Sequence, residues 1–184
     1  MTGVQTCALP IFYDWVGRNL GYGFAREYCT ILSIPSECLA RGYGDCGEAA
    51  LVFITLCRLC GVPARFQSAW RVAPWKPGMH DWAEIYLPPW GWMPVDPYES
   101  VNWTSLAEDL APHEREMIRA FHFGGLDGWR MVANRDHGMP LSPPKVHPRS
   151  DDVDSQRGEV EWEGGNLYYD AFDYKLEASE ILIE

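Results

Sequence analysis

The chain has few basic residues. Lysine and arginine together number 15 against 26 aspartates and glutamates, which gives a formal net charge of −11. Proteins that bind nucleic acid present a basic stripe or patch to the phosphates, so this charge balance argues against that class of partner. We therefore expect no nucleic-acid ligand.

Long apolar runs are also missing. No stretch reaches the roughly 20 apolar residues that a membrane-spanning helix needs, so we expect no membrane span. The chain has 184 residues, of which 47% are hydrophobic. That length and composition suit one domain with a core of its own, with an appendage at most.

The chain has six cysteines, and they do not form a zinc-finger set. A chain of this size and apolar content does not need a disulfide scaffold, so we expect free thiols. Cys57 and Cys60 form a Cys-x-x-Cys, but no second ligand pair at zinc-finger spacing accompanies it, and we interpret both as core packing. Four histidines are scattered without metal-ligand spacing: His113, His122, His137 and His147. We predict no metal and no cofactor.

Residues 1–11 lack capping, amphipathic and signal-peptide features, since no basic segment precedes a long apolar core. The string resembles translated adapter sequence from assembled sequencing reads. We therefore expect a non-native leader over 1–11 and a natural chain that enters near Phe12, so the cellular compartment stays open. A short helix is predicted over 12–20, ending near Gly21.

A buried helix is predicted to begin at Cys46. The preceding Asp45 is a suitable N-cap, and Glu48 lies three residues further on, as in a capping box. The stretch from Ala49 to Cys60 is apolar nearly all round, which favours burial on most sides. Gly61 is well placed to end the helix.

Cys46 would then lie in the first helical turn. Unpaired N–H groups and the helix dipole favour negative charge there, and such positions can lower a thiol pKa from about 8.5 to roughly 3.5–7.5. Gly44 and Gly47 leave room for a substrate backbone close to the sulfur. These features favour a reactive thiol over a small buried hydrophobe.

Downstream, a predicted hairpin carries a histidine and an aspartate. A strand over 64–72 precedes it, and a strand over 80–87 and a return strand over 92–96 flank a turn around Pro89. With this turn, His80 and Asp96 fall roughly opposite each other, close enough for the carboxylate to hold the imidazole in one tautomer. Cys46, His80 and Asp96 are the parts of an activated-thiolate site.

Four ordered blocks carry a family resemblance: Gly44-Asp45-Cys46-Gly47-Glu48-Ala49-Ala50, Cys60-Gly61-Val62-Pro63-Ala64-Arg65, His80-Asp81-Trp82-Ala83-Glu84-Ile85-Tyr86 and Gly91-Trp92-Met93-Pro94-Val95-Asp96. Together they resemble the core of the transglutaminase-like superfamily. The resemblance implies a papain-like α+β fold, with the nucleophile at the N-terminus of a central helix packed on an antiparallel sheet. It also implies that Cys46 attacks an acyl carbon, that His80 moves the proton and that Asp96 orients His80.

Other site residues are expected around this core. The backbone N–H of Cys46, at a helix N-terminus, suits an oxyanion hole. Tyr22 and Tyr43 are candidate second donors, because the region before the cysteine often supplies one in the resembling family. Trp82 is a candidate substrate-binding residue among several tryptophans that could line a groove for peptide or glycan: Trp70, Trp75, Trp90, Trp92 and Trp103.

We expect a single domain over 12–184, with the core at 12–100 and an extension at 101–184. In the extension, a helix is predicted over 106–121 and a strand over 129–135. A hairpin of strands at 159–163 and 167–174 is predicted to complete the main sheet.

Three functions compete at this point. The first is a cysteine hydrolase that cleaves amide bonds of a peptide or protein through a thioester. The second is an amine acyltransferase that cross-links glutamine side chains with the same three residues. Peptide N-glycanases share a similar core, although this chain lacks the paired Cys-x-x-Cys zinc motif that they usually carry upstream. A non-enzymatic binding module is disfavoured, because binding alone would not require all three residues.

Overall fold

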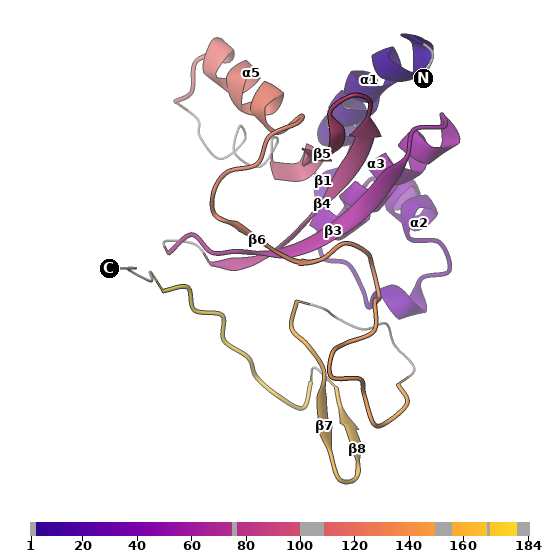
Figure 1. Cartoon of the computed structure of the whole chain (residues 1–184), viewed down its shortest axis with the longest axis vertical. Coiled ribbons are helices and arrows are strands. Elements are labelled where there is room, and N and C mark those ends of the chain that lie inside the picture. Colours follow the sequence, from indigo (N-terminus) through magenta and orange to yellow (C-terminus); the bar gives the residue numbers. More distant parts are fainter. Residues whose placement is uncertain (1–2, 75–76, 100–108, 150–155, 169, 180–184) are drawn as a thin grey trace.

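A computed structural model describes residues 3–74, 77–99, 109–149, 156–168 and 170–179. The fold is α+β, with a central antiparallel sheet covered by helices on one face (Figure 1). The helices are α1 (Gly3–Asn19), α2 (Ile34–Arg41), α3 (Cys46–Leu59) and α5 (Pro112–Phe121), with a 3-10 turn η1 (Tyr28–Thr30). The strands are β1 (Gly21–Tyr22), β2 (Tyr43–Gly44), β3 (Ala64–Arg71), β4 (Gly78–Leu87), β5 (Gly91–Val95), β6 (Arg130–Asn134), β7 (Val160–Trp162) and β8 (Gly165–Leu167).

The central sheet has the strand order β5-β4-β3-β6, and every neighbouring pair is antiparallel. Helix α3 packs on β3 and β4, and α1 and α2 pack in turn on α3. Because side chains alternate along a strand, Phe66, Ala83 and Ile85 face this helix and are buried with Phe53 in the core. The central helix is therefore held between the sheet and two other helices.

Both ends of α3 follow from local sequence. Asp45 is the N-cap, and its carboxylate accepts the backbone N–H of Glu48 at 2.8 Å. At the other end, Gly61 has φ +74°, and the N–H of Val62 donates to the carbonyl of Cys57 at 2.9 Å. This is the Schellman arrangement, in which a left-handed glycine lets the chain turn away.

The predicted capping box forms only in part. Its second half requires the Glu48 carboxylate to turn back to the N-cap, but Glu48 is fully buried and pairs with Arg41 of α2. A buried carboxylate needs a charged partner, which the backbone of Asp45 does not provide. The Glu48 carboxylate therefore forms the ion pair with Arg41 instead of the capping contact, and this pair links α2 to α3.

The first helix is longer than predicted. It begins at Gly3 rather than near Phe12, and Leu9, Tyr13 and Val16 are all buried in the core. These positions lie three or four residues apart, so they share one helical face. The absence of an N-cap signal concealed this start. The non-native origin of residues 1–11 stays a prediction.

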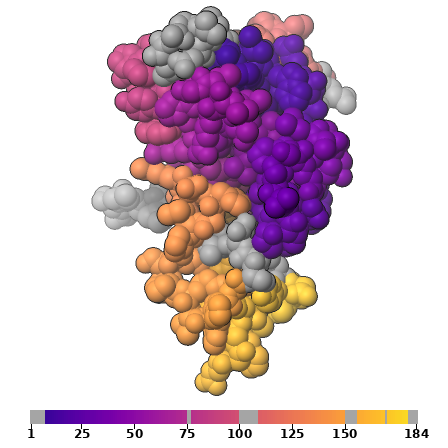
Figure 2. Space-filling model, turned by 90° about the vertical axis from the view of Figure 1, so that its right-hand side faces the viewer, coloured from indigo at the N-terminus to yellow at the C-terminus, as the bar shows by residue number. Residues whose placement is uncertain are grey.

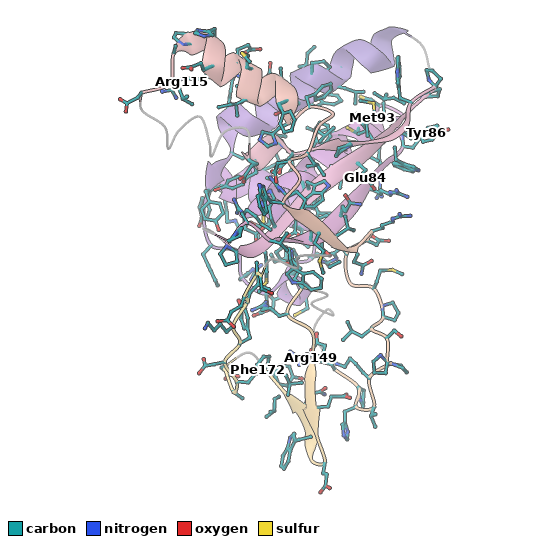
Figure 3. The ribbon with its side chains drawn as sticks, turned by 60° about the vertical axis from the view of Figure 1, so that its left-hand side comes forward. Glu84, Tyr86, Met93, Arg115, Arg149 and Phe172 are labelled. Atoms are coloured by element: carbon teal, nitrogen blue, oxygen red, sulfur yellow. The ribbon has the colours of Figure 1, made fainter. Side chains whose placement is uncertain are left out.

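The C-terminal extension contributes one strand to the main sheet. β6 pairs with β3 at its edge, whereas β7 and β8 form a separate two-stranded sheet (Figure 1). The prediction that this hairpin completes the main sheet is therefore wrong. The hairpin has its own anchor: Arg149, labelled in Figure 3, is buried, pairs with Glu159 at 2.8 Å and stacks over Tyr168. The predicted helix over 106–121 begins at Pro112, and residues 106–108 lie outside the described part.

Candidate active site

Cys46 is the first residue of α3 and is half-buried. Its thiol donates to a carboxylate oxygen of Asp81 on β4, with an Sγ–Oδ2 distance of 3.6 Å. Burial, followed by the negative charges of Asp81 and Asp45, raises the pKa of the Cys46 thiol well above its ordinary value. The expected lowering by the helix terminus is therefore outweighed.

His80 and Asp96 form a direct pair in the interior. The His80 Nε2 lies 2.7 Å from the Asp96 Oδ2, and both side chains are buried. Extending the β4–β5 register from Ala83 and Val95 puts Asp96 opposite Trp82, so His80 is its diagonal neighbour on the same face. The hairpin brings the two predicted residues together, although not directly opposite each other.

The Asp96 carboxylate is held ionised. Its Oδ1 accepts the backbone N–H of Glu99 at 2.9 Å, and its Oδ2 lies 3.2 Å from the Arg130 Nη1. Although burial opposes ionisation, His80 and then Arg130 lower the pKa of Asp96 to about 2. An ionised partner on Nε2 fixes the N–H at that nitrogen, which leaves Nδ1 as the proton acceptor of the ring.

Sequence reasoning missed the charges around this pair. Arg130 on β6 also binds Asp127 at 2.9 Å, and Arg71 on β3 binds the buried Glu99 at 2.8 Å. The two arginines come from strands that meet only through the β3–β6 pairing. An Asp-Pro-x-Glu spacing after β5 could have drawn attention to Glu99, but nothing in the sequence indicates Arg130.

One cluster in the described part has the composition of a metal site. A nitrogen of His80 and carboxylate oxygens of Asp96 and Glu99 lie within 4.8 Å of one another. Both carboxylates already pair with buried guanidinium groups, so a cation would compete with Arg71 and Arg130. The arrangement fits a charge network that orients the histidine better than a metal centre.

Of the candidate donors, Tyr22 lies nearest the thiol environment. Its strand β1 pairs with β2, which places it beside Gly44, and its ring centroid lies 4.9 Å from that of Tyr98 at a tilted angle of 39°. Partial burial of this mostly exposed side chain, followed by its neighbours Cys46 and Asp45, raises the pKa of Tyr22, so its hydroxyl remains a donor at neutral pH. Tyr43 is exposed and lies under the Arg41 guanidinium.

Trp82 does not face a groove. It is completely buried, with its ring 6.2 Å from that of His80 and 5.4 Å from the Arg130 guanidinium. This burial disagrees with a substrate contact and assigns the ring to packing beside the histidine. Among the other tryptophans, Trp90 and Trp92 are exposed at the β4–β5 turn, whereas Trp75 and Trp103 lie outside the described residues.

A cavity of about 380 Å³ is lined by Asp45, the N-cap of α3, and by Asp81, the hydrogen-bond partner of the Cys46 thiol. It lies between the segment 22–29, the helix-facing side of β3 and β4, and parts of the extension, including His137 and Gln156. Figure 2 shows the extension, orange to yellow, beneath the purple body that holds α2 and α3. Asp45 and Asp81 form the wall shared by the cavity and the thiol, because both line the cavity and both contact the start of α3.

Comparison with known proteins identifies the family. The family model of the transglutaminase-like superfamily matches residues 3–97, just over half of the chain. The chain belongs to the transglutaminase-like superfamily, and this membership supports a cysteine-dependent enzyme in general terms.

A solved structure of "a Putative Cysteine Protease from Cytophaga hutchinsonii" is similar at 25% identity and a TM-score of 0.41. The match covers 48% of this chain and 30% of that chain. A search of curated proteins finds no significant match. No helix in the described residues is long and apolar enough to cross a membrane.

Proposed function

We propose that the protein is a cysteine-dependent amide hydrolase with Cys46 as nucleophile, His80 as proton carrier and Asp96 as orienting group. One observation supports the proposal most directly: His80 and Asp96 form a buried pair at 2.7 Å, and the charge of Asp96 acts on the Cys46 thiol at the N-terminus of α3. A peptide or protein is the substrate we favour, with glycan-bearing amides included.

The geometry suggests how the reaction would proceed. Because Asp96 holds the N–H at Nε2, the His80 Nδ1 would accept the thiol proton as Cys46 attacks the carbonyl carbon. The backbone N–H of Cys46 lies in the first helical turn, where amides have no intrahelical acceptor, and it would bind the oxygen that becomes negative. His80 would then protonate the leaving amine, which gives a thioester, and would activate water to release the acyl group.

Amine acyl transfer is the second candidate. It uses the same three residues and differs only in whether an amine or water attacks the thioester. The cavity wall formed by Asp45 and Asp81 favours this alternative, since carboxylates beside the thiol would attract a cationic amine.

A single reaction mixture distinguishes these functions. The protein is incubated with a glutamine-containing peptide library, with and without a labelled primary amine, and the products are separated by mass. Backbone cleavage supports the hydrolase, a gain of label supports acyl transfer, and loss of ammonia alone supports side-chain deamidation. Cys46→Ala should abolish all products, whereas Cys60→Ala, which removes an exposed thiol at the far end of α3, should retain them. Full turnover by Cys46→Ala would exclude Cys46 as the nucleophile.

A further inference from the structure

Asp81, the residue after His80 in β4, contacts both the Cys46 thiol and Gln156 of the C-terminal extension. In β4 the side chains of His80 and Asp81 point to opposite faces, so Asp81 lies on the side that faces α3. There its Oδ2 accepts the Cys46 thiol at 3.6 Å, and its Oδ1 accepts the side-chain amide of Gln156 at 3.1 Å. The carboxylate is thus held between the proposed nucleophile and the C-terminal extension.

Gln156 is itself fixed by several contacts. Its Nε2 donates to the carbonyl oxygens of Ala69 at 2.9 Å and His80 at 3.2 Å, besides Asp81. Its backbone carbonyl accepts the Trp70 indole N–H at 2.8 Å. Gln156 is anchored across β3 and β4, and this anchoring fixes the direction of the Asp81 carboxylate.

We propose that Asp81 is a positioning residue that keeps Cys46 as a neutral, hydrogen-bonded thiol in the resting enzyme, and that Gln156 holds the carboxylate in that position. The proposal rests on the proposed function, because it concerns the same nucleophile. It implies that the thiol proton is removed only when His80 acts on it, so the thiol has low reactivity toward general electrophiles.

The charges that face the sulfur agree with this role. Asp45 approaches from the N-cap, Asp81 from β4 and Asp96 from the end of β5, and all three raise the pKa of Cys46. The tyrosines that interact with the thiol, Tyr22, Tyr28 and Tyr98, all have raised pKa values and stay neutral at physiological pH. The backbone N–H of Asp81 acts in the opposite direction and lowers the thiol pKa.

Substitution of the side chain alone separates these effects. Asp81→Asn keeps the shape and the backbone N–H while removing the charge. We expect the pH midpoint for iodoacetamide alkylation of Cys46, followed by peptide mapping, to fall by about one unit. Labelling at pH 7 should rise roughly threefold to tenfold, because the larger thiolate fraction is partly offset by the lower nucleophilicity of a less basic thiolate.

Two further variants test the mechanism. Asp136→Asn is the matched control: it removes an exposed carboxylate from the same cavity wall, and it should leave the midpoint unchanged. Gln156→Ala should lower the midpoint less than Asp81→Asn does, and the double variant Asp81→Asn/Gln156→Ala should match Asp81→Asn alone. Additive shifts would show that Gln156 acts independently of Asp81.

The outcomes also separate this inference from the proposed function. Alkylation needs no substrate, so an unchanged midpoint in Asp81→Asn would overturn the role of Asp81 even if the wild-type protein cleaves amides. A lowered midpoint in Asp81→Asn, together with a wild-type protein that turns over no amide substrate, would support the thiol-holding role of Asp81 and contradict the hydrolase. Circular dichroism of each variant confirms that the comparison is made between folded proteins.

Discussion

One carboxylate oxygen of Asp96, Oδ2, contacts both His80 and Arg130: it lies 2.7 Å from the imidazole Nε2 and 3.2 Å from the guanidinium Nη1. The guanidinium side chain is only 2% exposed, so the three charged or polar groups form an interior unit. Although burial raises the pKa of Asp96, His80 and then Arg130 lower it to about 2, so the carboxylate is ionised at physiological pH and can fix the imidazole tautomer. A residue of the extension, more than 30 positions away, thereby supports the core of the proposed site.

The first prediction concerns Arg130→Met. The substitution keeps much of the volume but leaves Asp96 and Glu99 with less compensation in the interior, so we expect a loss of about 3–5 kcal/mol in the free energy of unfolding. Urea denaturation measures this change. The control is Arg18→Met, which removes an exposed pair with Asp14 and should cost at most about 1 kcal/mol. Equal losses in both variants would show that the buried Arg130 pairs stabilise the fold no more than the exposed Arg18–Asp14 pair does.

The second prediction concerns the orienting group. Asp96→Asn should fold, because its amide can still bond His80, but kcat should fall by roughly 10²–10⁴ since the imidazole is no longer held in the productive tautomer. Steady-state kinetics on an active peptide substrate measures this loss, with circular dichroism to verify folding.

Glu99 offers a test within the same site. One of its carboxylate oxygens lies 3.8 Å from the His80 Nε2, close enough to take over part of the orienting role once Asp96 is neutral. Asp96→Asn/Glu99→Gln should therefore be slower than Asp96→Asn, while Glu99→Gln alone should have a small effect. A wild-type kcat in Asp96→Asn would remove Asp96 from the mechanism. In a Cys46→Ala background, Asp96→Asn should cause no further loss, because the three residues act as a unit.

Much of this site could be predicted from the sequence because its parts are local. Asp45 and Cys46 share a helix start, and His80 and Asp96 share one hairpin, so turn position and strand alternation bring them close. The catalytic roles of Cys46, His80 and Asp96 stay predictions, whereas the family and the α+β fold are confirmed.

The missed features depend on tertiary contacts. Arg130 and Gln156 reach the site from the extension across the sheet, and no periodic pattern records such a contact. Sequence reasoning missed Asp81 because strand alternation points its side chain to the face of the sheet opposite to that of His80. That face is the one that α3 covers. Glu48 does not make the expected capping contact with Asp45, because its buried carboxylate pairs with the Arg41 guanidinium instead. The pKa of Cys46 is raised rather than lowered because burial, followed by the charges of neighbouring carboxylates, outweighs the effect of the helix terminus.

The third prediction concerns acid stability. His122 is buried, and burial lowers its pKa below the ordinary value. The unfolded chain then binds more protons than the folded chain below about pH 6.5, so stability should fall as the pH drops through that value. His122→Gln should flatten this part of a stability–pH curve measured by urea denaturation. If the free energy of unfolding of His122→Gln falls as steeply between pH 6.5 and 5 as that of the wild type, another group causes the pH dependence.

A separate loss should follow at lower pH in both proteins. Because the pKa of Asp96 is depressed to about 2, its stabilisation is present above the unfolded value near 3.9 and is lost as the pH falls through the folded value. Its size is about 2 kcal/mol. This second loss is missing from Asp96→Asn, which keeps the two limbs of the curve distinguishable.

The last prediction concerns Gly47, which follows the proposed nucleophile. A Cβ at this position would lie 2.5 Å from the Tyr28 hydroxyl oxygen and 3.0 Å from the Asp81 Oδ2, although Gly47 has ordinary helical backbone angles. The hydroxyl cannot move freely, because it donates to the Asp45 Oδ1 at 2.5 Å. We expect Gly47→Ala to lower the free energy of unfolding by about 1–3 kcal/mol, since the overlap outweighs the gain of up to about 1 kcal/mol in helix propensity.

Tyr28→Phe tests this cause directly, because it removes the oxygen that the new methyl group would meet. The single change should cost about 1 kcal/mol for the lost hydrogen bond. In that background, however, Gly47→Ala should cost clearly less than in the wild type, so the two changes should be non-additive. Chemical denaturation of the four proteins measures the coupling. Gly78→Ala, whose Cβ would meet nothing within 4 Å, is the control and should stay within about 0.5 kcal/mol of the wild type. Equal costs of Gly47→Ala in both backgrounds would show that the Tyr28 hydroxyl does not dictate the glycine.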